Sequence, residues 1–137
     1  MTVLKFINYH VQDMSYQRNE NYHQTRSEIK MNPQISRKID INENRINVTL
    51  SIVVGSLENE TSPFKTSCAI TGIFDYQPEE DDADTGLDQL VRVNAVAILY
   101  PYARSIITML TTASNEYPGY IMPTVNVNRL LNDQEEA

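Results

Sequence analysis

The feature that most constrains the fold is an alternation of apolar residues at the even positions with mostly polar residues at the odd ones within residues 45–57. The apolar positions are Ile46, Val48, Leu50, Ile52 and Val54. Since successive side chains of a strand point to opposite faces, this alternation predicts a strand with one buried face. After a turn at 55–60, apolar residues again occupy even positions, at Phe64, Cys68, Ile70, Phe74 and Tyr76. We therefore expect residues 45–57 and 62–76 to pair as an antiparallel hairpin. Gly72, inside the second strand, indicates a bulge or a close backbone approach.

A helical pattern follows in the last third of the chain. From about residue 86 to 113, apolar residues recur at intervals of three and four, which is typical of an amphipathic helix. Pro101 lies inside this pattern and removes a helical hydrogen bond, so we expect a helix pair broken at the proline. Ile107 points off the main stripe. An apolar stripe after a set of strands must cover one face of their sheet, and the predicted fold class is therefore α+β.

The length favours a single domain over residues 1–137. Further strands are expected at 3–11 and around Ile35, Ile39 and Ile41, where apolar residues again alternate with polar ones. Three polar segments interrupt or end the domain, namely a long connection, an acidic loop and a frayed tail, at residues 12–34, 77–84 and 132–137.

Charge and cysteine content exclude several classes of function. The chain has 18 acidic residues against 11 lysines and arginines, a net charge of -7 that disfavours nucleic acids and anionic membranes as partners. The only cysteine, Cys68, excludes an internal disulfide and a multi-cysteine zinc site. No signal peptide is visible, and no uninterrupted apolar run is long enough to span a bilayer. We expect a soluble cytoplasmic protein.

No set of residues has the pattern of a catalytic or metal site. His10 and His23 lack metal-ligand spacing, and Cys68 lies on the apolar face of a strand without a predicted activating neighbour. The acidic residues within 79–84 lack the spacing of a calcium loop. We therefore expect no enzymatic activity, no metal and no cofactor. The C-terminal third instead has a surplus of Tyr and Met, which either completes the core or forms a surface for varied apolar chains.

Several short motifs resemble those of the SecB family of export chaperones. Residues 98–104, Ile-Leu-Tyr-Pro-Tyr-Ala-Arg, are similar to the family's I-L-F-P-Y-A-R signature. The segment Gly72-Ile-Phe74 resembles its G-I-F, and Val125-Asn126 followed by Leu130 is similar to its C-terminal motif. The resemblance covers roughly residues 3–131.

This resemblance implies a four-stranded antiparallel sheet with helices on one face, assembled as a dimer or a dimer of dimers. It also implies an ATP-independent holdase that binds unfolded or extended polypeptide clients in apolar grooves. The implied client-binding residues are Phe74, Tyr76, Tyr117, Tyr120 and Met122. The helix residues expected at packing or oligomer contacts are Leu99, Tyr102, Ile106, Met109 and Leu110. Arg104, in the signature, is expected to form a structural ion pair.

The chain departs from the family where export chaperones bind the SecA motor. Asp13 matches one acidic position, but Gln17 and Ser67 stand at the other two. Val127 replaces the phenylalanine of the C-terminal motif. These differences argue against docking on SecA. Some relatives of this type serve one dedicated client, such as an antitoxin, rather than general export.

Three hypotheses therefore stay open. A holdase predicts oligomers, binding of unfolded chains and no turnover. A structural or adaptor oligomer would bind one dedicated partner and have its groove filled by its own loop at 117–122. A small-molecule site or enzyme on the same fold would need a closed pocket with convergent polar groups, which no residue set here provides. The identity of the client and the choice between dimer and tetramer are left open by the sequence.

Overall fold

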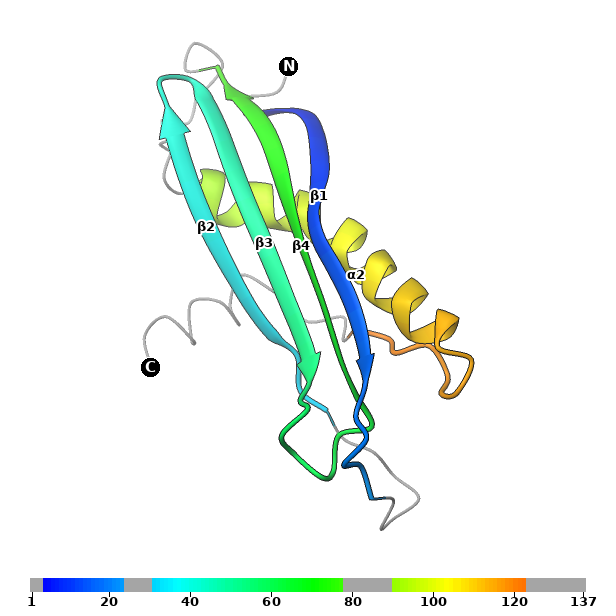
Figure 1. Ribbon diagram of the computed structural model, residues 1–137. Coiled ribbons are helices and arrows are strands. Elements are labelled where there is room, and N and C mark those ends of the chain that lie inside the picture. The colour runs from blue at the N-terminus through cyan, green and yellow to red at the C-terminus, as the bar shows by residue number, and fades with distance from the viewer. Residues whose placement is uncertain (1–3, 24–30, 78–89, 123–137) are drawn as a thin grey trace.

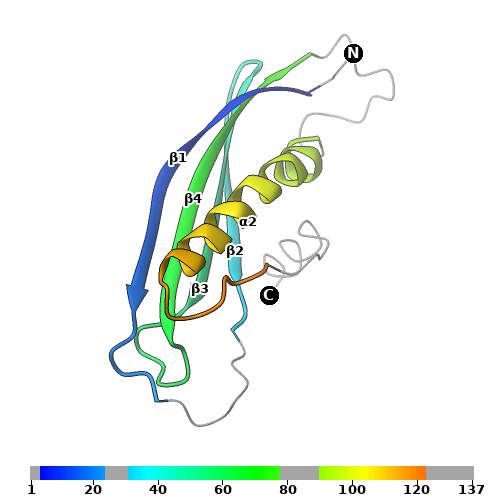
Figure 2. The ribbon, with the colours of Figure 1, turned by 90° about the vertical axis from the view of Figure 1, so that its right-hand side faces the viewer.

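A four-stranded antiparallel sheet carries one long helix on one of its faces (Figures 1 and 2). The computed structural model describes residues 4–23, 31–77 and 90–122. Its elements are β1 (Leu4–Arg18), β2 (Gln34–Asn42), β3 (Arg45–Gly55), β4 (Phe64–Tyr76), a π-helical segment η2 (Leu90–Ala95) and α2 (Val96–Ala113). The strand order β1-β4-β3-β2 leaves β1 and β2 at the two edges. The predicted α+β fold is confirmed.

The hairpin predicted from the alternation is confirmed as β3 and β4. Its register places Ile46 opposite Phe74 and Ile52 opposite Cys68, so the even positions of both strands share one face. These side chains form most of the core under the helix, and Ile46, Leu50 and Phe74 have no exposed surface. Burial of this continuous apolar face against the helix supplies the main driving force for folding.

β1 is longer than the sequence indicates, because it continues from the predicted strand through residues 12–18. These residues were expected to begin the polar connection. They pair with the first half of β4, and an edge strand tolerates polar side chains because backbone hydrogen bonds hold it. Two register shifts, between Phe6 and Asn8 and between Val11 and Asp13, keep the large apolar residues of β1 on the helix side.

Pro101 does not break the helix into a pair. The α-helix continues through the proline to Ala113, and Figure 1 shows one bent ribbon rather than two helices. The wider π-helical hydrogen bonding lies about two to three turns before the proline, in η2. Proline and π-turns are both recognised causes of helix bending. The predicted helix start near residue 86 lies outside the described residues.

The buried stripe of α2 is rotated relative to the predicted one. Its buried residues are Val96, Leu99, Tyr100, Ala103, Ile107 and Thr111. Ile107 was expected to point off the stripe, but it is fully buried against the sheet. The physical reason is that small residues, Ala103 and Thr111, share this face and let the helix approach the strands closely, whereas the larger Tyr102 and Met109 are left on the flank.

Gly72 marks the point of closest approach between sheet and helix. A Cβ atom there would lie 2.6 Å from Leu99 Cδ2 and 2.9 Å from Phe74 Cε1, so any larger residue would force these side chains to shift. The segment Val91–Ala113 has the length and hydropathy of a membrane span. Its stripe packs on the sheet of this same chain, however, which is the arrangement of a core helix.

Candidate functional site

The segment after α2 turns back and crosses the helix-covered face of the sheet toward β2 (Figure 2). Three hydrogen bonds of Tyr120 hold it. Its backbone N–H donates to Thr111 Oγ1 at 2.7 Å, and its carbonyl accepts from Thr108 Oγ1 at 2.9 Å. Its phenol donates to the carbonyl of Met31 at 2.9 Å, just before β2. The segment is therefore fixed to both the helix and the far side of the sheet.

A second attachment joins this segment to the end of β1. The guanidinium of Arg18 donates to both carboxylate oxygens of Glu116, with Nε–Oε1 at 2.9 Å and Nη2–Oε2 at 3.0 Å. These hydrogen bonds hold the pKa of Glu116 below its usual range. Both side chains are exposed, so the pair orients the segment more than it stabilises the fold.

The first cavity beside this segment, here called the aromatic hollow, has a volume of about 280 Å³. It is lined by Met31, Pro63, Phe64, Tyr117, Pro118, Gly119, Tyr120 and Ile121. The ring of Phe64 lies 5.9 Å from that of Tyr117 and 5.2 Å from that of Tyr16, centroid to centroid. The edge of this hollow is thus a small aromatic cluster of the kind that receives large apolar side chains.

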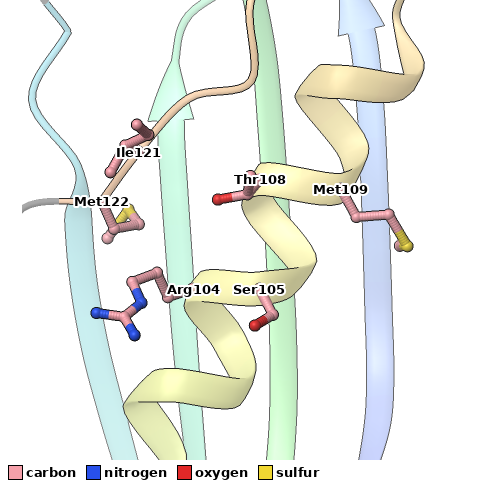
Figure 3. Close-up of a pocket in the computed structure, with 6 residues that line it drawn as sticks. All are labelled: Arg104, Ser105, Thr108, Met109, Ile121 and Met122. Carbon is pink, nitrogen blue, oxygen red and sulfur yellow. The ribbon is translucent and has the colours of Figure 1, made fainter.

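The second cavity, here called the arginine hollow, lies between the outer side of α2 and the end of the segment (Figure 3). Its volume is about 400 Å³, and it is lined by Arg104, Ser105, Thr108, Met109, Ile121 and Met122. Ile121 belongs to both hollows and is 78% exposed. The two hollows therefore meet at an isoleucine that no described residue covers, and together they form one apolar surface, the 117–122 groove.

The structure brings together three of the five predicted client-binding residues. Tyr117 and Tyr120 line the aromatic hollow and are half-buried. Met122 also lines the arginine hollow. Its side chain is only 1% exposed, so it mainly packs in the core and holds the segment in place. The side chains that sequence reasoning missed are Met31, Phe64, Met109 and Ile121, which come from four separate places in the chain.

The other two predicted residues do not lie on this groove. Phe74 is fully buried in the core beneath α2. Tyr76 pairs with Leu4 at the opposite end of β4 from Phe64, and its backbone N–H donates to the carbonyl of Asn44 in the β2–β3 turn. At about 3.3 Å per residue, the ten residues from Phe64 to Phe74 span some 33 Å of strand. Alternation placed these residues on the correct face but could not tell which end of the strand the groove occupies.

The ion pair expected for Arg104 is not formed within the described part of the chain. No carboxylate in residues 4–23, 31–77 or 90–122 lies within ion-pair distance of its guanidinium. Figure 3 shows the side chain leaving α2 to lie beside Met122, at the wall of the arginine hollow. The expected ion pair is thus not found among the described residues, and Arg104 lies at the lining of the arginine hollow.

A further apolar surface lies between β1 and the exposed side of α2, here called the β1 flank. It consists of Val11, Met14, Tyr102 and Met109, which are 39% to 51% exposed. The rings of Tyr102 and Tyr9 stack at 4.5 Å, so strand and helix are in contact along it. Among the helix residues expected at packing or oligomer contacts, Tyr102 and Met109 lie here. Ile106 and Leu110 are half-buried, and Leu99 is in the core.

The residues considered for chemistry are not assembled into a site. Cys68 is buried with its Sγ 3.7 Å from the carbonyl of Ala103, and burial, with a smaller contribution from Asp13, raises the pKa of its thiol to about 11. His10 and His23 are exposed. Within the described residues, no three His, Cys, Asp or Glu side chains are placed to hold a metal ion.

The positions corresponding to the SecA-binding acids do lie together on the outer face of the sheet. Asp13 is opposite Ala69, and Gln17 is opposite Lys65. Between these pairs, the hydroxyl groups of Ser15 and Ser67 are hydrogen-bonded at 2.8 Å. This part of the face thus carries one carboxylate, a lysine and a hydroxyl pair instead of an acidic cluster.

Comparisons with known proteins identify relatives of the whole chain. The family described as "Preprotein translocase subunit SecB" matches residues 1–137. The uncharacterized protein MJ0357 of Methanocaldococcus jannaschii is 31% identical over 98% of this chain and 86% of that protein. The protein-export protein SecB of Neisseria meningitidis is 30% identical over 74% of this chain and 66% of that protein, so the chain spans about two-thirds of that relative.

A solved structure with the same fold is the Rv1957 SecB-like chaperone of Mycobacterium tuberculosis, in complex with a ChAD peptide from the Rv1956 HigA1 antitoxin. The TM-score is 0.70 at 15% identity, and the match covers 89% of this chain and 90% of that one. At this identity the likeness concerns the fold alone.

Proposed function

Since this chain belongs to the SecB family, we propose that it is an ATP-independent holdase that binds unfolded or extended polypeptides in the 117–122 groove. Family membership supports a chaperone role in general. The observation that supports this particular surface is Ile121, which is 78% exposed between two mostly apolar hollows. Because Ile121 adjoins the apolar lining of both hollows, it extends them into a contiguous apolar patch, which is a feature of surfaces that meet a partner.

The size of the groove suits side chains rather than a folded protein. The hollows, of about 280 and 400 Å³, each have room for one or two large apolar side chains. Burying ~200 Å² of apolar surface at about 25 cal/mol per Å² contributes roughly 5 kcal/mol before the ordering costs of binding. Two contacts of this size, one in each hollow, would give a useful but reversible affinity. A chaperone that must later release its client requires an affinity of this kind.

The fixed conformation of the segment supports a second version of this function, an adaptor for one dedicated polypeptide. Hydrogen bonds of 2.7 to 2.9 Å tie both backbone groups and the phenol of Tyr120 to the body of the protein. Promiscuous binders commonly use surfaces that can repack, whereas a fixed groove discriminates between clients. The hydroxyl pair of Ser15 and Ser67 in place of an acidic cluster also favours a role away from SecA.

We further propose that the chain works as a homo-oligomer in the cytoplasm, with a second copy covering the part of the β1 flank formed by Val11, Met14 and Tyr102 and leaving Met109 at the arginine hollow. β1 is an edge strand, and no described strand pairs with its outer side. The flank beside it exposes two methionines, a valine and a tyrosine. An open backbone edge next to exposed apolar side chains is a surface that a soluble protein normally covers.

The test is aggregation of a chemically unfolded, slow-folding protein after dilution, with this chain present at a stoichiometric amount and without nucleotide. We expect suppression of light scattering and a co-eluting complex on size exclusion. The variant Ile121→Ser should suppress aggregation less well at unchanged thermal stability. The control Ile7→Ser removes an exposed isoleucine from β1 and should act as wild type.

Two results separate the versions of the proposal. Suppression with several unrelated unfolded proteins supports a general holdase. Absence of suppression, together with tight binding of one extended polypeptide that Ile121→Ser weakens, supports the dedicated adaptor. Absence of any binding would contradict both.

A further inference from the structure

The phenol of Tyr16, at the end of β1, has an unpaired hydroxyl group. Its oxygen atom is buried and has no hydrogen-bond partner among the described residues. A buried phenol normally finds a partner, as Tyr120 does by donating to the carbonyl of Met31 at 2.9 Å. The hydroxyl of Tyr16 lost its hydrogen bonds to water on folding without a replacement, which costs free energy in the protein without a client.

Tyr16 lies directly behind the lining of the aromatic hollow. It pairs with the fully buried Thr66, and its ring packs on that of Phe64 with centroids 5.2 Å apart. Phe64 in turn lines the hollow together with Tyr117. The hydroxyl of Thr66 donates to the carbonyl of Ser15 at 2.8 Å, so this polar neighbour already has a partner of its own. The unpaired hydroxyl is thus one ring away from a cavity of about 280 Å³.

One wall of this region is held in place by Asn19. Its side chain is buried, and its Nδ2 donates to the carbonyls of Asn59 and Ser62, each at 2.8 Å, in the turn before β4. Its backbone N–H donates to the carbonyl of Pro63 at 3.0 Å. The end of β1 is therefore fixed to the start of β4, and the ring of Tyr16 keeps its place in the stack.

The other wall contains the ring of Tyr117, which can rotate. Burial is the main cause of the raised pKa of the Tyr117 phenol, and Tyr16 adds to it electrostatically, so the two phenols lie near each other. The Tyr117 ring contacts the ring of Phe64 at 5.9 Å and that of Tyr22 edge-on at 6.4 Å. Rotation of this side chain breaks none of the backbone hydrogen bonds that hold the segment.

We propose that Tyr16 is a client-binding residue, whose hydroxyl donates a hydrogen bond to a backbone carbonyl of the bound polypeptide once the Tyr117 ring has rotated aside. This inference rests on the proposed function, because it assumes that an extended polypeptide enters the aromatic hollow. An extended segment offers a carbonyl at every residue, so one phenol donor recognises the backbone independently of the client's sequence. The bond favours binding because the hydroxyl gives up no other partner to form it.

The experiment measures two properties of the variant Tyr16→Phe, which keeps the ring that packs on Phe64 and removes only the hydroxyl. Urea unfolding without a client should find the variant as stable as wild type or more stable, because no hydrogen bond is lost. Fluorescence anisotropy with a labelled, unstructured peptide that carries Phe and Leu residues should find binding roughly threefold to tenfold weaker. A purely structural role would instead lower stability and affinity together.

The matched control is Tyr9→Phe, the same substitution on the same strand, where the ring stacks on Tyr102. It should bind the peptide as wild type does. A second set of peptides identifies the acceptor, because an ester in place of one amide near the Phe weakens the carbonyl there. For at least one of these peptides, binding to wild type should fall, whereas binding to Tyr16→Phe should fall no further.

Peptide binding that Tyr16→Phe leaves unchanged would overturn this inference and leave the proposed function intact. A less stable Tyr16→Phe variant would also overturn it, since the hydroxyl would then have a partner, such as a buried water, in the protein without a client. Equal weakening by Tyr9→Phe would contradict it too, because the effect would not belong to this position. Failure of the peptide to bind wild type would overturn this inference together with the proposed function.

Discussion

The backbone N–H of Tyr120 donates a hydrogen bond of 2.7 Å to Oγ1 of Thr111, a fully buried side chain in the last turn of α2. The same hydroxyl donates to the carbonyl of Ile107 at 2.9 Å. One buried hydroxyl group thus links the end of the helix to the returning segment, and the position of the groove depends on it.

Thr111→Val should therefore destabilise the protein although it keeps the shape of the side chain. It leaves the N–H of Tyr120 without an acceptor, which costs about 1–3 kcal/mol. The measurement is urea unfolding, compared with Thr112→Val at the exposed neighbouring position, which should change little. A Thr111→Val variant as stable as Thr112→Val would show that the segment does not depend on this bond.

The attachment between Arg18 and Glu116 should weaken in acid. Pairing with Arg18 holds the pKa of Glu116 in the folded protein below its value in the unfolded chain. The pair therefore contributes fully to folding stability above the unfolded-state pKa, and this contribution is lost as the pH falls through the folded-state pKa. We expect Glu116→Gln to lower the melting temperature slightly at pH 7 and to match wild type in acid. Glu58→Gln, at an exposed glutamate without an ion pair among the described residues, should show no such convergence.

Gly72→Ala should destabilise the fold through contact with Leu99. The added methyl group would lie 2.6 Å from Leu99 Cδ2, and overpacking of this kind costs about 1–3 kcal/mol. Leu99→Ala alone should cost about 2–5 kcal/mol by leaving a cavity. The double variant should cost less than the sum, because the methyl group then occupies space that Leu99 vacated. Additive losses in chemical unfolding would contradict the close approach.

Met122 and Ile121 should respond differently to truncation, although they are neighbours. Met122 is 1% exposed, so Met122→Ala should cost about 2–4 kcal/mol of folding stability. Ile121 is 78% exposed, so Ile121→Ala should stay within about 0.5 kcal/mol of wild type and weaken client binding instead. Equal losses of stability in both variants would place Ile121 in the core.

Met14→Glu should reduce the mass of the oligomer, because it places a charge on the β1 flank. Its control is Gln17→Glu, which adds the same charge to the same strand on the outer face, opposite Lys65. Multi-angle light scattering measures both. An unchanged mass in Met14→Glu would show that a second copy does not cover this surface.

The parts of the fold that sequence patterns predicted are those that local side-chain periodicity determines. Alternation at Ile46 to Val54 defines a strand with one buried face wherever that strand lies. Gly72 was expected at a bulge or a backbone approach, but its neighbours are the side chains of Leu99 and Phe74. The second half of β1 escaped prediction because backbone pairing with β4, and not an apolar pattern, keeps residues 12–18 extended.

The site was predicted only in part because it is assembled from distant segments. Tyr117 and Tyr120, singled out from the aromatic content of their own loop, both line the aromatic hollow. Phe64 joins them only through the antiparallel course of β4, which brings the start of that strand to the loop. The side of the helix that packs on the sheet was also mispredicted, because Ile107 is buried there and Met109 is not. The small residues of the buried stripe, and not the largest apolar ones, determine which side packs on the sheet.

The strand order has a consequence for how the chain reaches this structure. β3 and β4 are neighbours in sequence and can close as a hairpin at once, whereas β1 must wait for β4, with which it pairs from Leu4 opposite Tyr76 to Arg18 opposite Phe64. Pairing between such distant segments is slow because the chain loses much entropy before contacts form. During synthesis β1 therefore lacks its partner strand, and its apolar side chains, such as Leu4 and Phe6, lack the core that later covers them. The nascent protein passes through the same condition as the polypeptides that we propose it holds.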